Sequence, residues 1–209
     1  MALILFDYDG VLADTLDDLL QFGQQACNEL GVDHRVTKED LSNLEVMSFA
    51  TYGRACEVPE HLVSEFVRIC LHLFAEKKTP PAVFAGLSEV MRDLSIRHTL
   101  VIVTTNTSQN VNAFLAQHRL DGLVQAVYGV DTPGSKAHKI SLARERFMGN
   151  NTPMGAFMIG DSLSDMLAAK EASVTSIAVT WGHQGLKQLL RGNPDHVVHS
   201  PHALIEIVG

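Results

Sequence analysis

Residues 2–15 read ALILFDYDGVLADT, and this stretch, together with the residues after it, indicates the architecture of the chain. A short apolar run ends at Asp7, and Gly10 comes shortly after, which predicts a buried strand that leads into a turn. Side chains along a strand alternate between its two faces, so we expect Asp7 and Asp9 to point into the same crevice. The stretch therefore predicts a strand with two carboxylates at its carboxyl end.

The rest of the chain divides into two regions that differ in the spacing of their apolar residues. From about residue 14 to residue 78, apolar residues recur at helical spacing without a convincing strand, and Thr79-Pro80-Pro81 ends this stretch. Beyond it, apolar strands alternate with helical stretches, which indicates a parallel sheet covered on both faces. The expected strands are residues 99–103, 123–128, 156–159, 176–179 and 196–198, and the expected helices are residues 87–94, 109–118, 140–147, 164–171 and 186–190. We predict an α/β core of residues 1–14 and 80–209, interrupted by a helical insertion of residues 15–79.

Composition excludes several classes of protein. With 209 residues, the chain can bury about 70% of the surface of its unfolded form and needs no disulfide or metal to fold. Its 24 acidic against 16 basic residues argue against a dedicated nucleic-acid binder. It has neither an apolar run of about 18 residues nor the basic start of a signal peptide, which predicts no membrane span. Cys27, Cys56 and Cys70 form no CxxC pattern, so we expect buried, reduced thiols in a cytoplasmic protein.

Polar residues gather at the expected carboxyl ends of three strands, which is where open α/β sheets bind their ligands. They are Asp7 and Asp9, then the Thr104-Thr105-Asn106 segment, and then Asp161 and Asp165; Lys136 lies in the loop before the helix expected at residues 140–147. Carboxylates this close would repel one another unless a cation lies among them. A hard cation with oxygen ligands, Mg²⁺, fits best, and Mg²⁺ held in this way acts on phosphates.

The same residues provide the groups that phosphoryl transfer needs. One aspartate can attack phosphorus and form an aspartyl-phosphate. A second aspartate, two residues further on, can protonate the leaving oxygen and then activate water. The Thr104 hydroxyl and the Lys136 ammonium can hold the phosphoryl oxygens.

These motifs resemble those of the haloacid dehalogenase-like hydrolase superfamily. Residues 6–15 resemble its first motif, DxDGxxxDT, and Val103-Thr104 resembles its second, an apolar strand that ends in Thr or Ser. Residues 160–165, GDSLSD, match its fourth motif, GDxxxD. The stretch IAVTWG at residues 177–182 is typical of the phosphoglycolate phosphatase-like branch. The resemblance covers both ends of the chain in the correct order, and it implies a Rossmann-like core with a helical cap at residues 15–79.

By this resemblance, Asp7 is the nucleophile and Asp9 is the general acid and base. The backbone carbonyl of Asp9 and the carboxylates of Asp7 and Asp161 would bind Mg²⁺, with Asp165 as a second acidic position beside the metal, directly or through water. Family members that act on halides or phosphonates lack the acid found here at Asp9. Its presence favours a phosphate ester as the substrate.

Several assignments stay open at this level. Lys136 is favoured as the phosphate-binding lysine, with Lys139 as the alternative. Thr104 is favoured over Thr105, which together with Asn106 would offer backbone N–H groups to the substrate. Asp14-Thr15 is equally consistent with a simple N-cap of the first cap helix, and Trp181-Gly182 with packing and a turn.

The functional prediction is a Mg²⁺-dependent phosphatase that hydrolyses a small phosphorylated metabolite through an aspartyl-phosphate, with phosphoglycolate as the first substrate to test. A phosphomutase of the same superfamily is the alternative among enzymes. A catalytically silent binding module on this fold is the alternative from another class. The sequence carries no sign of its oligomeric state.

Overall fold

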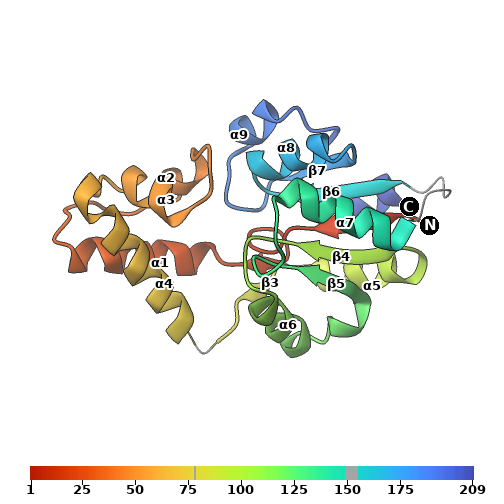
Figure 1. Ribbon diagram of the computed structural model, residues 1–209, viewed down its shortest axis with the longest axis horizontal. Helices are drawn as coiled ribbons and strands as arrows, with labels where there is room; N and C mark the ends of the chain where they lie inside the picture. Colours follow the sequence, from red (N-terminus) through yellow and green to blue (C-terminus); the bar gives the residue numbers. More distant parts are fainter. Residues whose placement is uncertain (78, 149–154) are drawn as a thin grey trace.

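The computed structural model describes residues 1–77, 79–148 and 155–209, and the chain forms a helical lobe beside an α/β core (Figure 1). The two chain termini lie together at the far side of the core, away from the lobe. In the core, the six-stranded sheet has the order β5-β4-β1-β6-β7-β8, and every neighbouring pair is parallel. Its strands are β1 (Leu3–Phe6), β4 (Thr99–Val103), β5 (Val124–Tyr128), β6 (Ala156–Gly160), β7 (Thr175–Val179) and β8 (His196–Val198). The α/β class with a parallel sheet is confirmed.

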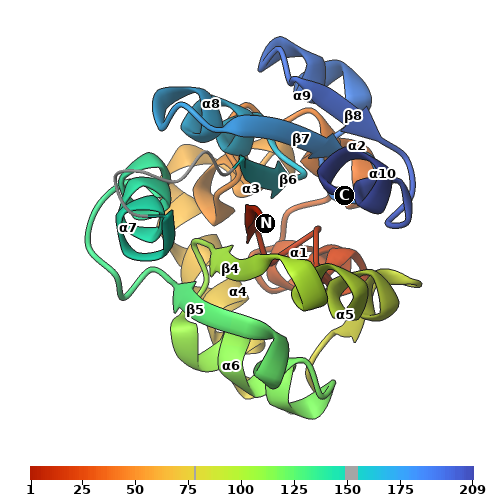
Figure 2. The same ribbon diagram turned by 90° about the vertical axis from the view of Figure 1, so that its right-hand side faces the viewer.

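Helices cover both faces of the sheet, because β1 is apolar on both sides. Ala2, Ile4 and Phe6 belong to one hydrophobic cluster, and Leu3 and Leu5 belong to another. The first cluster packs against α5 (Leu87–Arg97), α6 (Ser108–Gln117) and α10 (Ala203–Val208), and the second against α7 (Lys136–Met148) and α8 (Leu163–Glu171). Figure 2 shows α7 and α8 on one side of the sheet and α5 and α10 on the other. Helix α9 (Leu186–Arg191) packs on β7 through Leu189. A short 3-10 turn at Asp121–Leu123 precedes β5.

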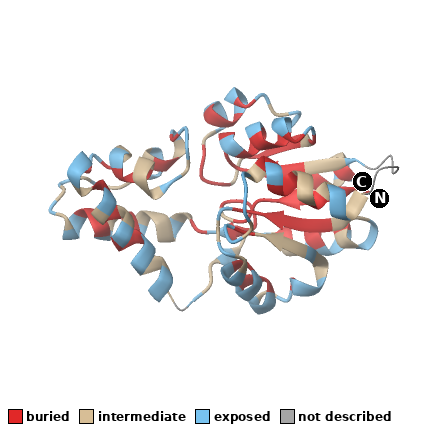
Figure 3. Ribbon diagram, viewed as in Figure 1, coloured by how far each residue is buried: buried red, intermediate tan, exposed pale blue. Residues whose placement is uncertain are grey.

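The helical lobe comprises α1 (Leu16–Glu29), α2 (Lys38–Ser42), α3 (Phe49–Ala55), a 3-10 turn at Glu60–Leu62 and α4 (Val63–Glu76). It has a hydrophobic cluster of its own, in which Tyr52 packs edge-on against Phe66 with ring centroids 5.7 Å apart. All three cysteines are free and buried in this cluster. The lobe and the core therefore each have a buried interior. In both, the outward helix faces are exposed, and in the core the strands are the most buried elements (Figure 3).

A two-stranded antiparallel ribbon joins the lobe to the core, and the sequence patterns did not predict it. The outgoing strand β2 (Ala13–Asp14) pairs with the returning strand β3 (Ala82–Val83). Strands of two residues are too short to show a period, so the sequence signal there was only the proline boundary. The segment that leaves the core and the segment that returns to it are therefore hydrogen-bonded to each other. Among the described residues, no helix combines the length and the apolar character needed to cross a membrane.

Candidate active site

Asp7 is positioned by the alternation of β1. The strand ends at Phe6, and the backbone N–H of Asp7 still donates to the Ile159 carbonyl of β6 at 2.9 Å. Since Leu3 and Leu5 face α7 and α8, the Asp7 side chain follows them toward those two helices. Tyr8 faces the other side, where its ring packs edge-on against Phe114 with centroids 5.1 Å apart. The carboxyl ends of the strands point toward the helical lobe (Figure 1).

Lys136 meets Asp7 from the start of α7. Its Nζ lies 3.0 Å from Asp7 Oδ1 and forms an ion pair with Asp165. The expectation that Lys136 lies in a loop before a helix starting at Ile140 is wrong, because Lys136 is the first residue of α7. The Ser135 hydroxyl accepts the N–H of His138 and so begins the helix four residues earlier than the apolar pattern indicates.

Lys139, the alternative lysine, points elsewhere. Its side chain is buried, and its Nζ approaches the backbone carbonyl of Thr104 at 3.4 Å. Burial, and then the nearby Lys136 ammonium, lower the pKa of Lys139. Of the two lysines, Lys136 is the one that contacts the carboxylates.

Asp165 joins the same cluster from the first turn of α8. Its Oδ2 accepts the backbone N–H of Ser162 at 3.1 Å and the Ser162 hydroxyl at 2.6 Å, and its Oδ1 pairs with Lys136. The Ser162 hydroxyl accepts the Asp165 N–H in return, which completes a capping box at the start of α8. Both oxygens of Asp165 are thus already engaged by protein groups.

Asp9 lies beyond the strand, in a tight turn. The Tyr8 carbonyl accepts the N–H groups of Leu12 and Ala13, and Gly10 has a φ of 75°, a conformation that favours glycine. The turn, rather than strand alternation, therefore sets the position of Asp9.

The end of β4 holds the Asp9 carboxylate. The Asn106 side-chain amide donates to Asp9 Oδ2 at 3.0 Å, and the Asn106 backbone N–H donates to the buried Thr104 hydroxyl at 3.0 Å. Thr105 is exposed. Asn106 thus contacts the proposed acid through its side chain, whereas the sequence suggested a backbone contact with substrate.

A loop after β7 completes the site. The sequence suggested packing and a turn for its Trp181-Gly182 pair and did not single out His183. His183 is buried, its backbone N–H donates to Asp161 Oδ2 at 2.7 Å, and its Nε2 lies 3.1 Å from Thr15 Oγ1. Thr15 occupies the N-cap position of α1, but its side chain makes no capping hydrogen bond there. The Trp181 indole donates to the Val11 carbonyl at 3.2 Å, in keeping with a packing role. The only sequence signal for His183 was its position just past the end of an apolar strand.

Two glycines allow this loop to approach Asp161. A Cβ on Gly10 would overlap the Asp161 carboxylate, and a Cβ on Gly182 would overlap the Asp161 side chain and the Gly10 carbonyl. Any side chain at either position would therefore push Asp161 away from its place in the cluster.

The electrostatics of the cluster are those of several carboxylates that share one buried space. Burial, together with the neighbouring carboxylates, raises the pKa of Asp7 to about 8, even though Lys136 opposes the rise. Burial and then Asp165 raise the pKa of Asp161 to about 7. Burial lowers the pKa of Lys136, but the carboxylates of Asp165 and Asp7 outweigh this effect and the net shift is upward.

This arrangement fits a divalent cation. Oxygens of Asp7, Asp161 and Asp165 all lie within 4.8 Å of one another. Asp7 Oδ1 is buried, and no described group makes a hydrogen bond of good geometry to it despite the nearby Lys136 ammonium. Oxygen donors and excess negative charge are what Mg²⁺ requires. Because Asp165 is already engaged, Asp7 and Asp161 are the carboxylates most available to a metal.

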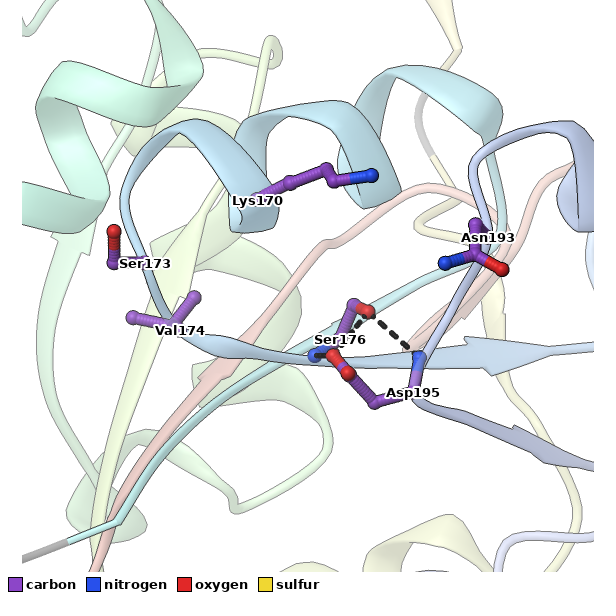
Figure 4. Close-up of a pocket in the computed structure, with 6 residues that line it drawn as sticks. All are labelled: Lys170, Ser173, Val174, Ser176, Asn193 and Asp195. Atoms are coloured by element: carbon purple, nitrogen blue, oxygen red, sulfur yellow. Dashed lines mark hydrogen bonds between the residues drawn. The ribbon is translucent and has the colours of Figure 1, made fainter.

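Two other features of the described residues do not belong to this cluster. His34, Asp40 and Cys56 lie close together in the helical lobe, where Asp40 caps α2 by accepting the Thr37 N–H at 2.7 Å. A hollow of about 210 Å³ lies at the amino ends of β7 and β8, the edge of the sheet opposite the carboxylates. Figure 4 shows its lining, in which Asp195 accepts hydrogen bonds from Ser176.

The raised carboxyl pKa values predict how stability depends on pH. Between about pH 4 and 8 the folded protein binds more protons at Asp7 and Asp161 than the unfolded chain does, so the metal-free protein should lose stability as pH rises. Mg²⁺ should counteract this loss, raising Tm by roughly 5–10 °C at pH 8 when present at about 100 times its Kd. Thermal melts with Mg²⁺ or EDTA at pH 5.5 and pH 8 measure both effects. An equal Mg²⁺ shift at the two pH values would contradict the prediction.

Comparison with known proteins agrees with the motifs. Residues 4–179 match the family model described as haloacid dehalogenase-like hydrolase. The chain is 26% identical over 211 residues to the phosphoglycolate phosphatase of Synechococcus elongatus, covering 100% of this chain and 97% of that protein. It is 29% identical over 219 residues to the 5'-nucleotidase of Pseudomonas aeruginosa, covering 98% and 94%.

A solved structure shares the whole fold. A haloacid dehalogenase-like family protein from Streptococcus pneumoniae superposes with a TM-score of 0.85 at 24% identity, covering 100% of this chain and 99% of that one. At this level of identity, the structural similarity shows the fold alone.

Proposed function

The chain belongs to the haloacid dehalogenase-like hydrolases, and from that premise we propose that it is a Mg²⁺-dependent phosphatase that works through an aspartyl-phosphate on Asp7. The observation that carries the proposal is the buried convergence of Asp7 with Lys136, Asp161 and Asp165 at one edge of the sheet. Family membership, a relative named as a phosphoglycolate phosphatase and another named as a 5'-nucleotidase support a phosphate monoester as the substrate.

Each side chain then has a chemical task. The Asp7 carboxylate attacks phosphorus, and the leaving oxygen takes a proton from Asp9. Asp9 next removes a proton from the water that hydrolyses the aspartyl-phosphate. Lys136, held by Asp165, binds phosphoryl oxygens from the α7 side, and the Thr104 hydroxyl binds them from the β4 side.

Asp7, Asp161 and the backbone carbonyl of Asp9 are the groups that would hold Mg²⁺. When bound, Mg²⁺ supplies positive charge that offsets the clustered carboxylates and the phosphoryl oxygens. Asp165 acts mainly on Lys136, because both of its oxygens are already engaged. Asn106 orients the Asp9 carboxylate through the 3.0 Å hydrogen bond.

The experiment is a phosphate-release screen with and without Mg²⁺. The panel contains 2-phosphoglycolate as the first candidate, nucleoside 5'-monophosphates because of the nucleotidase relative, sugar phosphates and para-nitrophenyl phosphate. We expect Mg²⁺-dependent release of inorganic phosphate. Isomerisation of a sugar phosphate without release would favour a phosphomutase, and no turnover of any substrate would favour a silent binding module.

We also propose that residues 15–79 act as a cap over this site. Four contacts support this. The Gly185 N–H donates to the Ser42 carbonyl at 3.1 Å, and Arg191 pairs with Glu45. The side-chain amides of Gln184 and Gln188 both donate to the Leu44 carbonyl, at 2.7 and 3.0 Å. These contacts join the helical lobe to the segment that follows the loop after β7, the loop that contains His183. A cap held there would exclude water and select the substrate.

Loosening these contacts should weaken substrate binding. We expect the double variant Gln188→Ala, Arg191→Ala to speed hydrogen exchange at the Gly185 amide and to raise the KM for the best substrate several-fold, because the lobe then leaves the core more often. Mass-spectrometric exchange and steady-state kinetics measure the two effects. Arg68→Ala, which breaks an exposed ion pair with Glu65 within the lobe, is the matched control. Faster exchange with an unchanged KM would argue against a cap.

A further inference from the structure

Gln184 lies between the helical lobe and the start of α8, and both ends of its side-chain amide are engaged. The residue is only 2% exposed. Its Oε1 accepts the backbone N–H of Leu163 at 2.6 Å, and its Nε2 donates to the backbone carbonyl of Leu44 at 2.7 Å. Leu163 is the first residue of α8, whereas Leu44 lies in the lobe between α2 and α3. One side chain therefore joins a carbonyl of the lobe to an N–H group of the core.

The two partners determine which way the Gln184 amide faces. Both partners are backbone groups, so the Leu163 N–H can only donate and the Leu44 carbonyl can only accept. The opposite orientation would place the NH₂ group of the amide against an N–H and its oxygen against a carbonyl. The Leu44 carbonyl thus holds the amide in the orientation that presents Oε1 to Leu163.

The N–H of Leu163 depends on this contact. The first N–H groups of a helix have no carbonyl partner within the helix. The Ser162 hydroxyl caps α8 by accepting the N–H of Asp165, and the Leu163 N–H is satisfied by Gln184 instead. Asp165 belongs to the same helical turn and pairs with Lys136. Gln184 therefore supports the turn that holds Lys136.

Gln188 makes the contact with the lobe but not the contact with α8. Its Nε2 also donates to the Leu44 carbonyl, at 3.0 Å, while its Oε1 accepts a hydrogen bond from Arg191 of the same helix at 3.0 Å. Gln188 thus joins the lobe to α9, whereas Gln184 joins the lobe to α8. The two glutamines share one acceptor and differ in what lies at the other end of the amide.

We propose that Gln184 is a positioning residue that couples docking of the lobe to the arrangement of the first turn of α8. With the lobe docked, the Leu44 carbonyl holds the amide and the Leu163 N–H keeps its acceptor. With the lobe away, Nε2 loses this partner, the amide is free to rotate, and the turn that carries Asp165 is held less firmly. The inference rests on the proposed functions of the site and of the lobe, because it makes the site complete only when the lobe is closed.

Hydrogen exchange of single amides, followed by NMR, tests this coupling without a substrate. The double variant Gln188→Ala, Arg191→Ala loosens the lobe and leaves Gln184 in place, and we expect its Leu163 amide to exchange about 3–10-fold faster than in the wild type. The amide of Ile102, inside β4, is the internal control and should not change. In a Gln184→Met background the Leu163 amide should already exchange rapidly, and the same two substitutions should add less than about 2-fold.

Two results of the exchange experiment would overturn the proposal. One is a Leu163 amide that is unchanged in the double variant, which itself keeps Gln184. The other is an equal acceleration in the wild-type and Gln184→Met backgrounds, because exposure of α8 by a departing lobe would produce it without any part played by Gln184.

Kinetics separate Gln184 from a residue that only docks the lobe, and Gln188→Met is the matched control. Saturating substrate keeps the lobe docked, so Gln188→Met should raise KM and leave kcat within about 2-fold of wild type. Gln184→Met should also raise KM, and it should lower kcat by about 10-fold because the first turn of α8 lacks its contact even under a closed lobe. Equal kcat values in the two variants would contradict a positioning role. If the wild-type protein hydrolyses no phosphate ester, the proposed function has failed, whereas the exchange result still decides the coupling.

Discussion

Replacing Asp7 by Asn should abolish phosphate release while leaving the protein folded and at least as stable as the wild type. The amide keeps the size of the carboxylate but cannot attack phosphorus, so we expect activity to fall by about 10³-fold or more. Stability should not fall with it, because burial, and after it the neighbouring carboxylates, raise the pKa of Asp7 to about 8. Removing one of these charges relieves repulsion in the metal-free protein.

Phosphate release and thermal melts in EDTA at pH 8 measure the two halves of this prediction. Asp121→Asn, at an exposed aspartate, is the control for the amide substitution itself. The variant should also lose much of the Mg²⁺ shift in Tm, because one of the two carboxylates that would hold the metal is gone. Full activity in Asp7→Asn would exclude Asp7 as the nucleophile, and a lower Tm in EDTA would contradict the account of repulsion.

Replacing Lys136 by Met should damage both catalysis and stability. Lys136 pairs with Asp165 and lies 3.0 Å from Asp7 Oδ1, so its loss leaves two buried carboxylates without a cation. Breaking a buried ion pair in this way costs about 3–5 kcal/mol in free energy of unfolding. The loss should be smaller at pH 5.5 than at pH 8, because Asp7, whose pKa burial and the neighbouring carboxylates raise to about 8, binds a proton at the lower pH. Activity should fall by about 10²–10³-fold, the usual effect of removing one donor to a phosphoryl or oxyanion oxygen.

Lys139→Met provides the matched comparison, with the same substitution three residues further along the same helix. Its ammonium is buried, its pKa is lowered, and it contacts a backbone carbonyl rather than a carboxylate. We expect its activity to stay within about 3-fold of wild type and its stability to change by less than that of Lys136→Met. Urea unfolding and kinetics on both variants decide the choice that the sequence left open. An inactive Lys139→Met with an active Lys136→Met would reverse the assignment.

Most of the architecture could be predicted from short-range patterns. The strand ending at Phe6, the strand at Thr99–Val103 and the alternation of helices with apolar strands after Pro81 all follow from local hydrophobic periodicity. The DxD and GDxxxD motifs each lie within a few residues of a strand end, so parallel strands bring them to one edge wherever the rest of the chain goes. The sheet and its acidic edge could therefore be predicted from the sequence.

Contacts between elements could not be predicted in this way. The β2–β3 ribbon has two residues on each side, and its partners lie about 70 residues apart in sequence. The start of α7 depends on a single serine cap, which the apolar pattern cannot show. Both errors arise where a few hydrogen bonds, rather than a hydrophobic period, determine the local structure.

The sequence by itself determined the α/β core, the helical insertion and the set of acidic residues at the strand ends, because these depend on periodicity and on motifs contiguous in the chain. Only the tertiary structure showed which lysine contacts Asp7, that Asp165 pairs with Lys136, and that His183 lies beside Thr15, 168 positions away in the sequence. The physical reason is that these contacts join residues that lie far apart in the sequence. Whether two such side chains touch depends on the relative positions of separate helices and loops on the sheet. Those positions would have to be known to within the length of one hydrogen bond.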